Sequence, residues 1–224
     1  MRQNTVKKAA RRGKAVVASG ASNVPADLSI WSGYSHGRDA CARSIMTVAL
    51  HLFVSRGYFN TTMRDIGSEA NLSAGAIYYH FKSKEDIARS LFDDLVASMG
   101  RHFNDIEARY NTAHDRCRAV VELLFQIAEE EPEAMEYMLY TKHLEFLDAG
   151  IPVCSSKPFR QMRAMVQKGM KNGEVRLMDP TVAAAAVYGG PLRMISMRLD
   201  GIVGVELPTL LDEVWESAWR SVSM

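Results

Sequence analysis

The sequence predicts an all-α protein. Capping and helix-ending residues stand at the boundaries of apolar runs, and no alternating apolar–polar stretch is strong enough to indicate a strand. At 224 residues the chain can bury a substantial core, as one compact body or as a small and a larger domain. Helical spacing of apolar residues is clearest at Ile87, Leu91, Leu95 and Met99.

The sharpest helix boundaries lie in residues 61–87. Thr62 and Asp65 have the spacing of a capping box, in which two side chains reciprocally bond the backbone N–H groups at a helix start. Ser83 and Asp86 repeat this spacing. These signals predict one helix after Thr62 and another after Ser83.

Between these two starts lie a turn and a short helix. Asn71 suits the left-handed conformation that ends a helix, Leu72 fills the turn, and Ser73 can cap the next helix. Residues 61–87 therefore predict a helix, a three-residue turn, a very short second helix and the start of a third.

The short middle helix presents small and polar residues. Small residues let a helix approach base edges closely, and hydroxyl, imidazole and ammonium groups suit phosphate oxygens. This pattern indicates a DNA-binding helix-turn-helix, although an ordinary helical hairpin with a polar face shares its geometry. The exposed set is Ala74, Gly75, Ala76, Tyr78, Tyr79 and His80, followed by Lys82 and Lys84.

These residues resemble the tetracycline-repressor (TetR) family over about residues 43–95. The matching positions are Ala49, Leu52, Phe53, Gly57, Tyr58, Thr61, Thr62, Ile66, Gly75, Tyr78, His80, Phe81 and Lys84, with Ile77 and Ile87 where the family has leucine. The resemblance implies a three-helix helix-turn-helix DNA-binding domain over residues 39–85. A larger helical ligand-binding and dimerisation domain over residues 86–224 is expected to follow.

The resemblance also implies roles in DNA contact. Arg64 is a candidate base reader, and the small residues 74–76 are expected against base edges. Tyr78, His80 and Lys84 match positions that contact the DNA backbone. The predicted DNA-binding residues are Thr62, Arg64, Ser73, Ala74, Gly75, Ala76, Tyr78, Tyr79, His80, Lys82 and Lys84.

Residues 1–38 carry seven Lys or Arg and one Asp, a net charge of +6. They are rich in Ala, Gly and Ser, so they are expected to be disordered in isolation. Two readings stay open. This N-terminal extension is either an arm that follows the DNA backbone or minor groove, or a solvated tail.

Downstream, helix-breaking residues divide a series of expected helices. Pro132 suits a first helical position, Glu133 complements the helix dipole, and Gly173 suits a helix end. Gly189–Pro191 is expected to kink its helix. The expected helices are 83–108, 115–130, 132–147, 158–171, 180–199 and 208–222, with a loop over 148–157.

Methionine and aromatic residues are frequent between residues 99 and 178. Methionine is flexible and polarizable, so it can line a site for varied apolar molecules, although such a stripe also fits plain core packing. With the family resemblance, it predicts an effector cavity for a ligand that the sequence does not name. The candidate ligand-binding residues are Phe103, Tyr137, Met138, Tyr140, His143, Met162 and Met165.

The last two helices are expected to mediate dimerisation as well as core burial. In the resembled family they form a four-helix interface across a two-fold axis. A two-fold dimer presents two recognition helices to half-sites about 34–36 Å apart, and hence to a pseudo-palindrome. The candidate interface residues are Val187, Leu192, Leu211, Val214, Trp215 and Trp219.

Other classes of function lack support. The sequence has no apolar run of about 18 residues for a membrane span, no phosphate-binding glycine loop and no nucleophile elbow. The six histidines lack metal-ligand spacing, so no metal and no cofactor are expected. Three widely spaced cysteines fit a reducing cytoplasm.

The sequence therefore predicts a regulator and not an enzyme. We expect a homodimeric repressor, released from a double-stranded DNA operator by a small, largely apolar effector. The alternatives are a ligand-independent architectural DNA-binding protein and a TetR-type activator.

Overall fold

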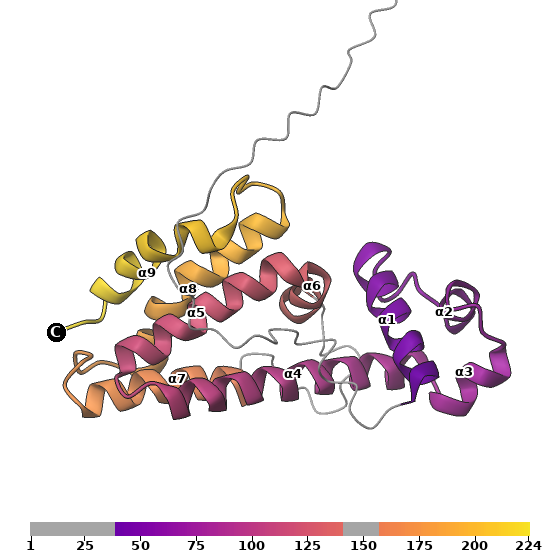
Figure 1. Cartoon of the computed structure of the whole chain (residues 1–224), viewed down its shortest axis with the longest axis horizontal. Coiled ribbons are helices and arrows are strands. Elements are labelled where there is room, and N and C mark those ends of the chain that lie inside the picture. Colours follow the sequence, from indigo (N-terminus) through magenta and orange to yellow (C-terminus); the bar gives the residue numbers. More distant parts are fainter. Residues whose placement is uncertain (1–38, 141–156) are drawn as a thin grey trace, which may run out of the picture.

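The computed structural model describes residues 39–140 and 157–224 (Figure 1). The predictions for the extension 1–38, for His143, and for the helix and loop over 141–156 lie outside these residues. The described part is helical, which confirms the all-α fold class. Its elements are α1 (Ala40–Ser55), α2 (Met63–Glu69), α3 (Ala74–His80), α4 (Lys84–Arg109), α5 (Ala113–Glu130), α6 (Pro132–Tyr140), α7 (Lys157–Lys171), α8 (Pro180–Leu199), the 3-10 helix η4 (Leu207–Leu210) and α9 (Leu211–Arg220).

Helix α4 runs along most of the folded part of the molecule. Figure 1 shows α1, α2 and α3 grouped at its N-terminal end, and α7 lying beside its C-terminal half. Helices α5, α8 and α9 pack together with α7 above that half. One helix therefore belongs both to the N-terminal group and to the larger bundle.

Most helix boundaries follow the predicted capping signals. Thr62 and Asp65 form both bonds of the capping box, and Asn71 has a φ of 54° at the end of α2. Asp179 caps α8, and α8 continues through Pro191 as a single helix. Capping bonds join residues only two to four positions apart, so the local sequence predicts them well.

The predicted start of the last helix was wrong. Pro208 lies in η4, and α9 begins at Leu211 and ends at Arg220, short of the predicted Val222. The backbone after α9 instead pairs with the segment after α7, since Arg176 N–H donates to the carbonyl of Val222 at 2.9 Å. This pairing ends the helix early.

A continuous apolar core extends from α1 to the C-terminal segment. Tyr137 of α6 is fully buried where the N-terminal group meets the bundle. Its hydroxyl donates to the carbonyl oxygen of Ala88 in α4 at 3.0 Å, and its ring stacks on Phe53 of α1 with centroids 6.3 Å apart. One side chain thus joins α1, α4 and α6.

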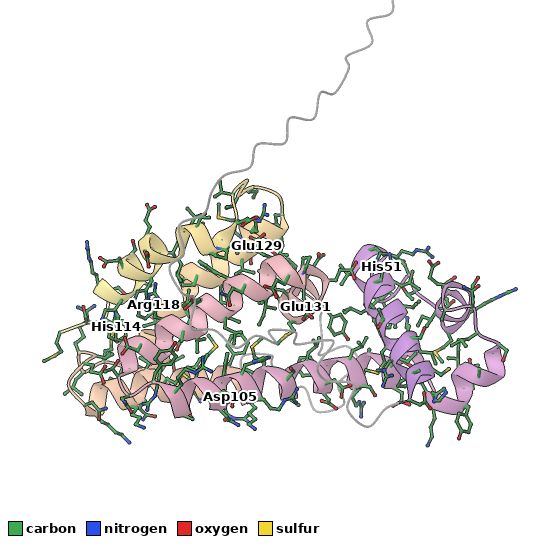
Figure 2. The ribbon with its side chains drawn as sticks, viewed as in Figure 1. His51, Asp105, His114, Arg118, Glu129 and Glu131 are labelled. Carbon is green, nitrogen blue, oxygen red and sulfur yellow. The ribbon has the colours of Figure 1, made fainter. Side chains whose placement is uncertain are left out.

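A second polar contact secures the α8–α9 connection. The Arg198 guanidinium donates from Nε to Glu129 Oε1 at 2.9 Å and from Nη2 to Oε2 at 2.8 Å. Leu207 N–H donates to the same carboxylate at 2.9 Å, and Arg198 also reaches the carbonyl of Val203. The hydrogen bonds from Arg198, then the one from Leu207 N–H and the charge of Arg198, hold the pKa of Glu129, labelled in Figure 2, below its ordinary 4.5.

We predict that Tyr137→Phe lowers the free energy of unfolding by about 1–2 kcal/mol, because the buried carbonyl of Ala88 loses a donor while the ring packing stays. Urea denaturation measures this change. Tyr188→Phe is the matched control. Tyr188 is also buried, but its hydroxyl has no oxygen or nitrogen partner in the described structure and lies against the weakly bonding Cys117 thiol, so a change below about 0.5 kcal/mol is expected. Equal losses in the two variants would contradict the role of the Tyr137 hydroxyl.

Glu129→Gln tests the second contact through its pH dependence. The pKa of Glu129 is lower in the folded chain, so its contribution is complete above the unfolded pKa and is lost as the pH falls through the folded pKa. The variant should be less stable than the parent by about 1–3 kcal/mol near neutral pH. That difference in unfolding free energy should shrink between about pH 6 and pH 3. A difference that stays constant across this range would count against the ion pair.

Candidate nucleic-acid interface

The start of α2 is a closed hydrogen-bonded unit. Asp65 N–H donates to the Thr62 hydroxyl at 3.2 Å, while Asp65 Oδ2 accepts from the Thr62 hydroxyl at 2.6 Å and from Thr62 N–H at 2.8 Å. The bond from the Thr62 hydroxyl, and then the bond from Thr62 N–H, hold the pKa of Asp65 below its ordinary value. Both donors of Thr62 are therefore already used within the chain, and its predicted phosphate contact requires one of them to turn.

Close packing of α2 against α3 sets the helix-turn-helix angle. A Cβ on Gly67 would lie 2.6 Å from the terminal methyl of Ile77 and 3.4 Å from the Leu72 carbonyl oxygen, so Ile77 would have to shift to admit a larger residue. Ile77 is buried, and Leu72 N–H donates to the Gly67 carbonyl at 2.9 Å across the turn. The interior side of α3 is thus fixed by packing.

The outer side of α3 is open. Ser73 caps the helix through Ala76 N–H, and Ala74 and Gly75 are exposed. Tyr78 and Tyr79 are 57% and 84% exposed, unusually high for aromatic side chains. The predicted DNA-binding residues of α3 therefore lie on its solvent side, apart from His80.

His80 is turned toward the N-terminus of α1. Its side chain is only 13% exposed, and its Nδ1 lies 3.6 Å from Oδ2 of Asp39. The other carboxylate oxygen of Asp39 accepts from Ala42 N–H at 2.8 Å and caps α1. The Asp39 carboxylate thus lies between the start of α1 and the end of α3.

Lys84 at the start of α4 is held by the loop after α1. Its ammonium donates to the Tyr58 carbonyl at 2.8 Å and lies 4.2 Å from the Tyr58 ring centroid. The Tyr58 hydroxyl donates to Glu85 at 3.0 Å. Glu85 has a lowered pKa because its own N–H, and then Ser83 and Tyr58, donate to it. An ammonium has three donors, so Lys84 keeps capacity for a phosphate.

The cap of α4 differs from the prediction at one atom. Asp86 N–H donates to the Ser83 hydroxyl at 3.2 Å, but the Asp86 carboxylate accepts from Lys82 N–H at 3.1 Å and not from Ser83. The returning bond therefore reaches one residue further back than a capping box does. Lys82 is exposed, as is Arg64 on α2.

Three residues that organise this region were not predicted from the sequence. Asp39 and Tyr58 position His80 and Lys84, and Thr61 is buried with its hydroxyl near the carbonyls of Leu52 and Gly57. Asp39 stands just before an apolar helical run, and this position is a sequence signal for a helix N-cap. Nothing local to Tyr58 indicates a contact 26 residues away.

The candidate effector-binding residues do not all lie around one part of the core. Phe103, Met138, Met162 and Met165 are buried in the core formed by α4, α6 and α7. Tyr137 instead faces α1 and α4. Tyr140 is 45% exposed, and its hydroxyl reaches toward α8 at the Ser196 carbonyl, 3.3 Å away.

The candidate dimer residues fall into a buried group and a partly exposed group. Val187, Leu211 and Trp215 are buried within the chain itself. Leu192, Val214 and Trp219 are partly exposed. The Trp215 indole donates to His114 Nε2 at 3.0 Å, which ties α9 to the start of α5.

Two further findings concern the described residues. None of their helices is long and apolar enough to cross a membrane. In residues 39–140 and 157–224, no three His, Cys, Asp or Glu side chains gather as a metal site would require.

Comparisons with known proteins agree with this geometry. Residues 45–91 match the family model of bacterial regulatory proteins of the tetR family. The transcriptional repressor KstR2 of Rhodococcus jostii is 26% identical over 147 residues, which cover 62% of this chain and 70% of that protein.

Solved structures share the fold at low sequence identity. The ketosteroid transcriptional regulator KstR2 of Mycobacterium tuberculosis superimposes with a TM-score of 0.68 at 17% identity, over 83% of this chain and 96% of that one. FadR of Bacillus subtilis, solved in complex with stearoyl-CoA, superimposes with a TM-score of 0.64 at 21% identity. The match covers 78% of this chain and 96% of that one. Residues 45–91 therefore match the tetR family of bacterial regulatory proteins, and the described chain shares its fold with solved transcriptional regulators.

Proposed function

We propose that this chain is a repressor that binds a pseudo-palindromic operator as a homodimer and releases it when a small, largely apolar ligand binds. The observation that carries the proposal is the continuity of α4. This helix starts at Lys84 beside the candidate phosphate contacts and ends at Arg109 within the bundle. Along it, Met99 and Phe103 are buried on the bundle side.

In this proposal residues 39–85 bind DNA, with residues 1–38 as an extension and residues 86–224 as the ligand-binding and dimerisation domain. The exposed Tyr78 and Tyr79, with Lys82 and Lys84, face the sugar–phosphate backbone. Arg64 reads a base edge from α2. The small side chains of residues 74–76 let α3 lie close to the major-groove floor.

We infer that the ligand has a long apolar body, such as an acyl chain or a fused-ring lipid. The relatives include a regulator solved with stearoyl-CoA and a ketosteroid transcriptional regulator. The interior of the bundle offers the matching chemistry, since Phe103, Met162 and Met165 are buried and apolar. Methionine side chains can repack around varied apolar shapes.

Helix α6 supplies a path by which ligand binding reaches the DNA side. It contacts α1 and α4 through Tyr137, and His51 of α1 bonds Glu133 of α6 at 2.7 Å. A ligand that favours another position of α6 would tilt α1 and α4 together. By linkage, such a ligand lowers DNA affinity, and DNA lowers ligand affinity by the same factor.

The outer side of α8 supports dimerisation. Val182 is 55% exposed, and a Cβ added to Gly189 or Gly190 would meet nothing within 4 Å. A second copy can therefore approach this backbone closely. Leu192, Val214 and Trp219 are exposed enough to contact it directly, while Val187, Leu211 and Trp215 support the two helices from within.

The deciding experiment selects duplexes from a random pool and then titrates stearoyl-CoA. We expect an inverted repeat with half-sites about one helical turn apart. We also expect stearoyl-CoA to weaken binding by about 5- to 150-fold. Coating of any duplex without preference would overturn the regulator proposal in favour of an architectural role. Selective binding that no acyl or steroid ligand alters would overturn ligand release alone.

Lys84→Ala should weaken binding to every duplex and make the salt dependence shallower by about one unit in log–log slope, because one phosphate contact is lost. Fluorescence anisotropy at several salt concentrations measures the slope. Lys171→Ala on α7 is the control, since it removes an exposed charge outside the motif and should leave the slope unchanged. Because Lys84 also bonds the Tyr58 carbonyl, thermal unfolding is recorded for both variants. An unchanged slope for a folded Lys84→Ala protein would remove Lys84 from the phosphate contacts.

A further inference from the structure

The positive charge of this chain is concentrated ahead of the proposed DNA-binding domain. Residues 1–38 have a net charge of +6, and five of their Lys and Arg stand within the eight residues 7–14, Lys-Lys-Ala-Ala-Arg-Arg-Gly-Lys. We call residues 7–14 the basic cluster. Short runs of Lys and Arg without acidic residues between them are typical of segments that bind nucleic acid.

The rest of the chain carries little positive charge with which to attract DNA. Residues 39–85 hold five Lys or Arg and four Asp or Glu, a net charge of +1. Residues 86–224 hold 15 Lys or Arg and 21 Asp or Glu, a net charge of −6. Sequence-independent affinity for DNA comes from cations that displace counterions from phosphates. The proposed DNA-binding domain therefore has an exposed helix for the groove but few charges for the backbone.

The structure places the end of the basic segment beside α3, the helix that we propose enters the major groove. Asp39, the first described residue, caps α1 by accepting from Ala42 N–H at 2.8 Å. Its other carboxylate oxygen lies 3.6 Å from Nδ1 of His80, the last residue of α3. Residues 1–38 therefore join the folded domain next to one end of α3, on the side that we propose faces DNA.

The basic cluster is within reach of the duplex from this point. A fully extended chain covers at most about 3.6 Å per residue, so the 24 residues between the cluster and Asp39 span up to about 86 Å. One turn of duplex is about 34 Å long. The length of the segment thus allows contact with DNA on either side of the half-site that α3 would occupy.

We propose that residues 1–38 are an arm that binds DNA, and that the basic cluster contacts the phosphate backbone of the duplex beside each half-site. The inference rests on the proposed DNA-binding function. Phosphates carry no sequence information, so the arm adds affinity for every sequence. The choice of operator stays with α2 and α3.

The acidic bundle of the same chain is the competing partner for the basic cluster. The net charge of −6 is spread over the 139 residues 86–224, whereas duplex DNA carries one negative charge per roughly 1.7 Å of its axis. The higher charge density favours DNA. The two partners also predict opposite results, because a cluster held by the bundle would have to be displaced before it met DNA, and removing its charge would then not weaken DNA binding.

The experiment compares the full-length parent with a full-length variant in which the five cations of the basic cluster become glutamine. Anisotropy with the selected operator is measured at several salt concentrations. Each lost phosphate contact removes about 0.9 unit of log–log salt slope, so the slope should become shallower by about two to four units. Affinity at low salt should fall by about tenfold or more, equally for the operator and for a scrambled duplex. The substitutions are Lys7→Gln, Lys8→Gln, Arg11→Gln, Arg12→Gln and Lys14→Gln.

The matched control removes five exposed cations from α7, which lies beside the C-terminal half of α4 and away from α3 (Figure 1). It loses the same net charge, and its salt slope should change by less than about one unit. Thermal unfolding is recorded for all three proteins. Equal changes of slope in the two folded variants would show that net charge alone matters, and would overturn the arm. The control substitutions are Lys157→Gln, Arg160→Gln, Arg163→Gln, Lys168→Gln and Lys171→Gln.

The length of the duplex supplies a second measurement that needs no folded control variant. The parent should bind the operator more tightly when about one helical turn of flanking duplex is added on each side, while the basic-cluster variant should bind both lengths alike. An unchanged salt slope in the variant, or tighter binding by the variant than by the parent, would overturn the inference. Failure of the parent to prefer any duplex would instead overturn the proposed function.

Discussion

The hydrogen bond from Tyr137 to the Ala88 carbonyl is the contact on which the arrangement of this molecule depends. It fixes α6 against α4, and the stacking of the same ring on Phe53 fixes α6 against α1. Three helices from two parts of the chain therefore share one rigid, fully buried side chain. Because close-packed interiors shift between discrete arrangements and do not deform smoothly, α6 cannot move without moving its neighbours.

The sequence predicted what depends on near neighbours in the chain. Thr62, Asn71 and Ser73 act locally, so the helix boundaries they set were correct. It did not predict the roles of Tyr58, Tyr137 and Arg198, whose partners lie 26 to 69 residues away. Pro208 shows a third case, in which a valid local signal opens the 3-10 helix η4 and the α-helix begins only after it, at Leu211.

Several polar groups on the side that we propose faces DNA already have partners within the chain. Thr62 is closed on Asp65, Lys84 on Tyr58, and His80 is directed at Asp39. Side chains that are ordered before binding lose less conformational entropy when they meet phosphates. The same side offers few groups that distinguish bases, so DNA shape and deformability should carry part of any sequence preference.

The position of Gly67 also limits how this motif is able to change over generations. A side chain there would push against the end of the Ile77 side chain, so the close packing of α2 on α3 depends on the narrow space between these two residues. Substitutions on the outer side of α3 leave that space untouched. The reading surface can therefore diversify toward new operators while the angle at which it is presented stays the same.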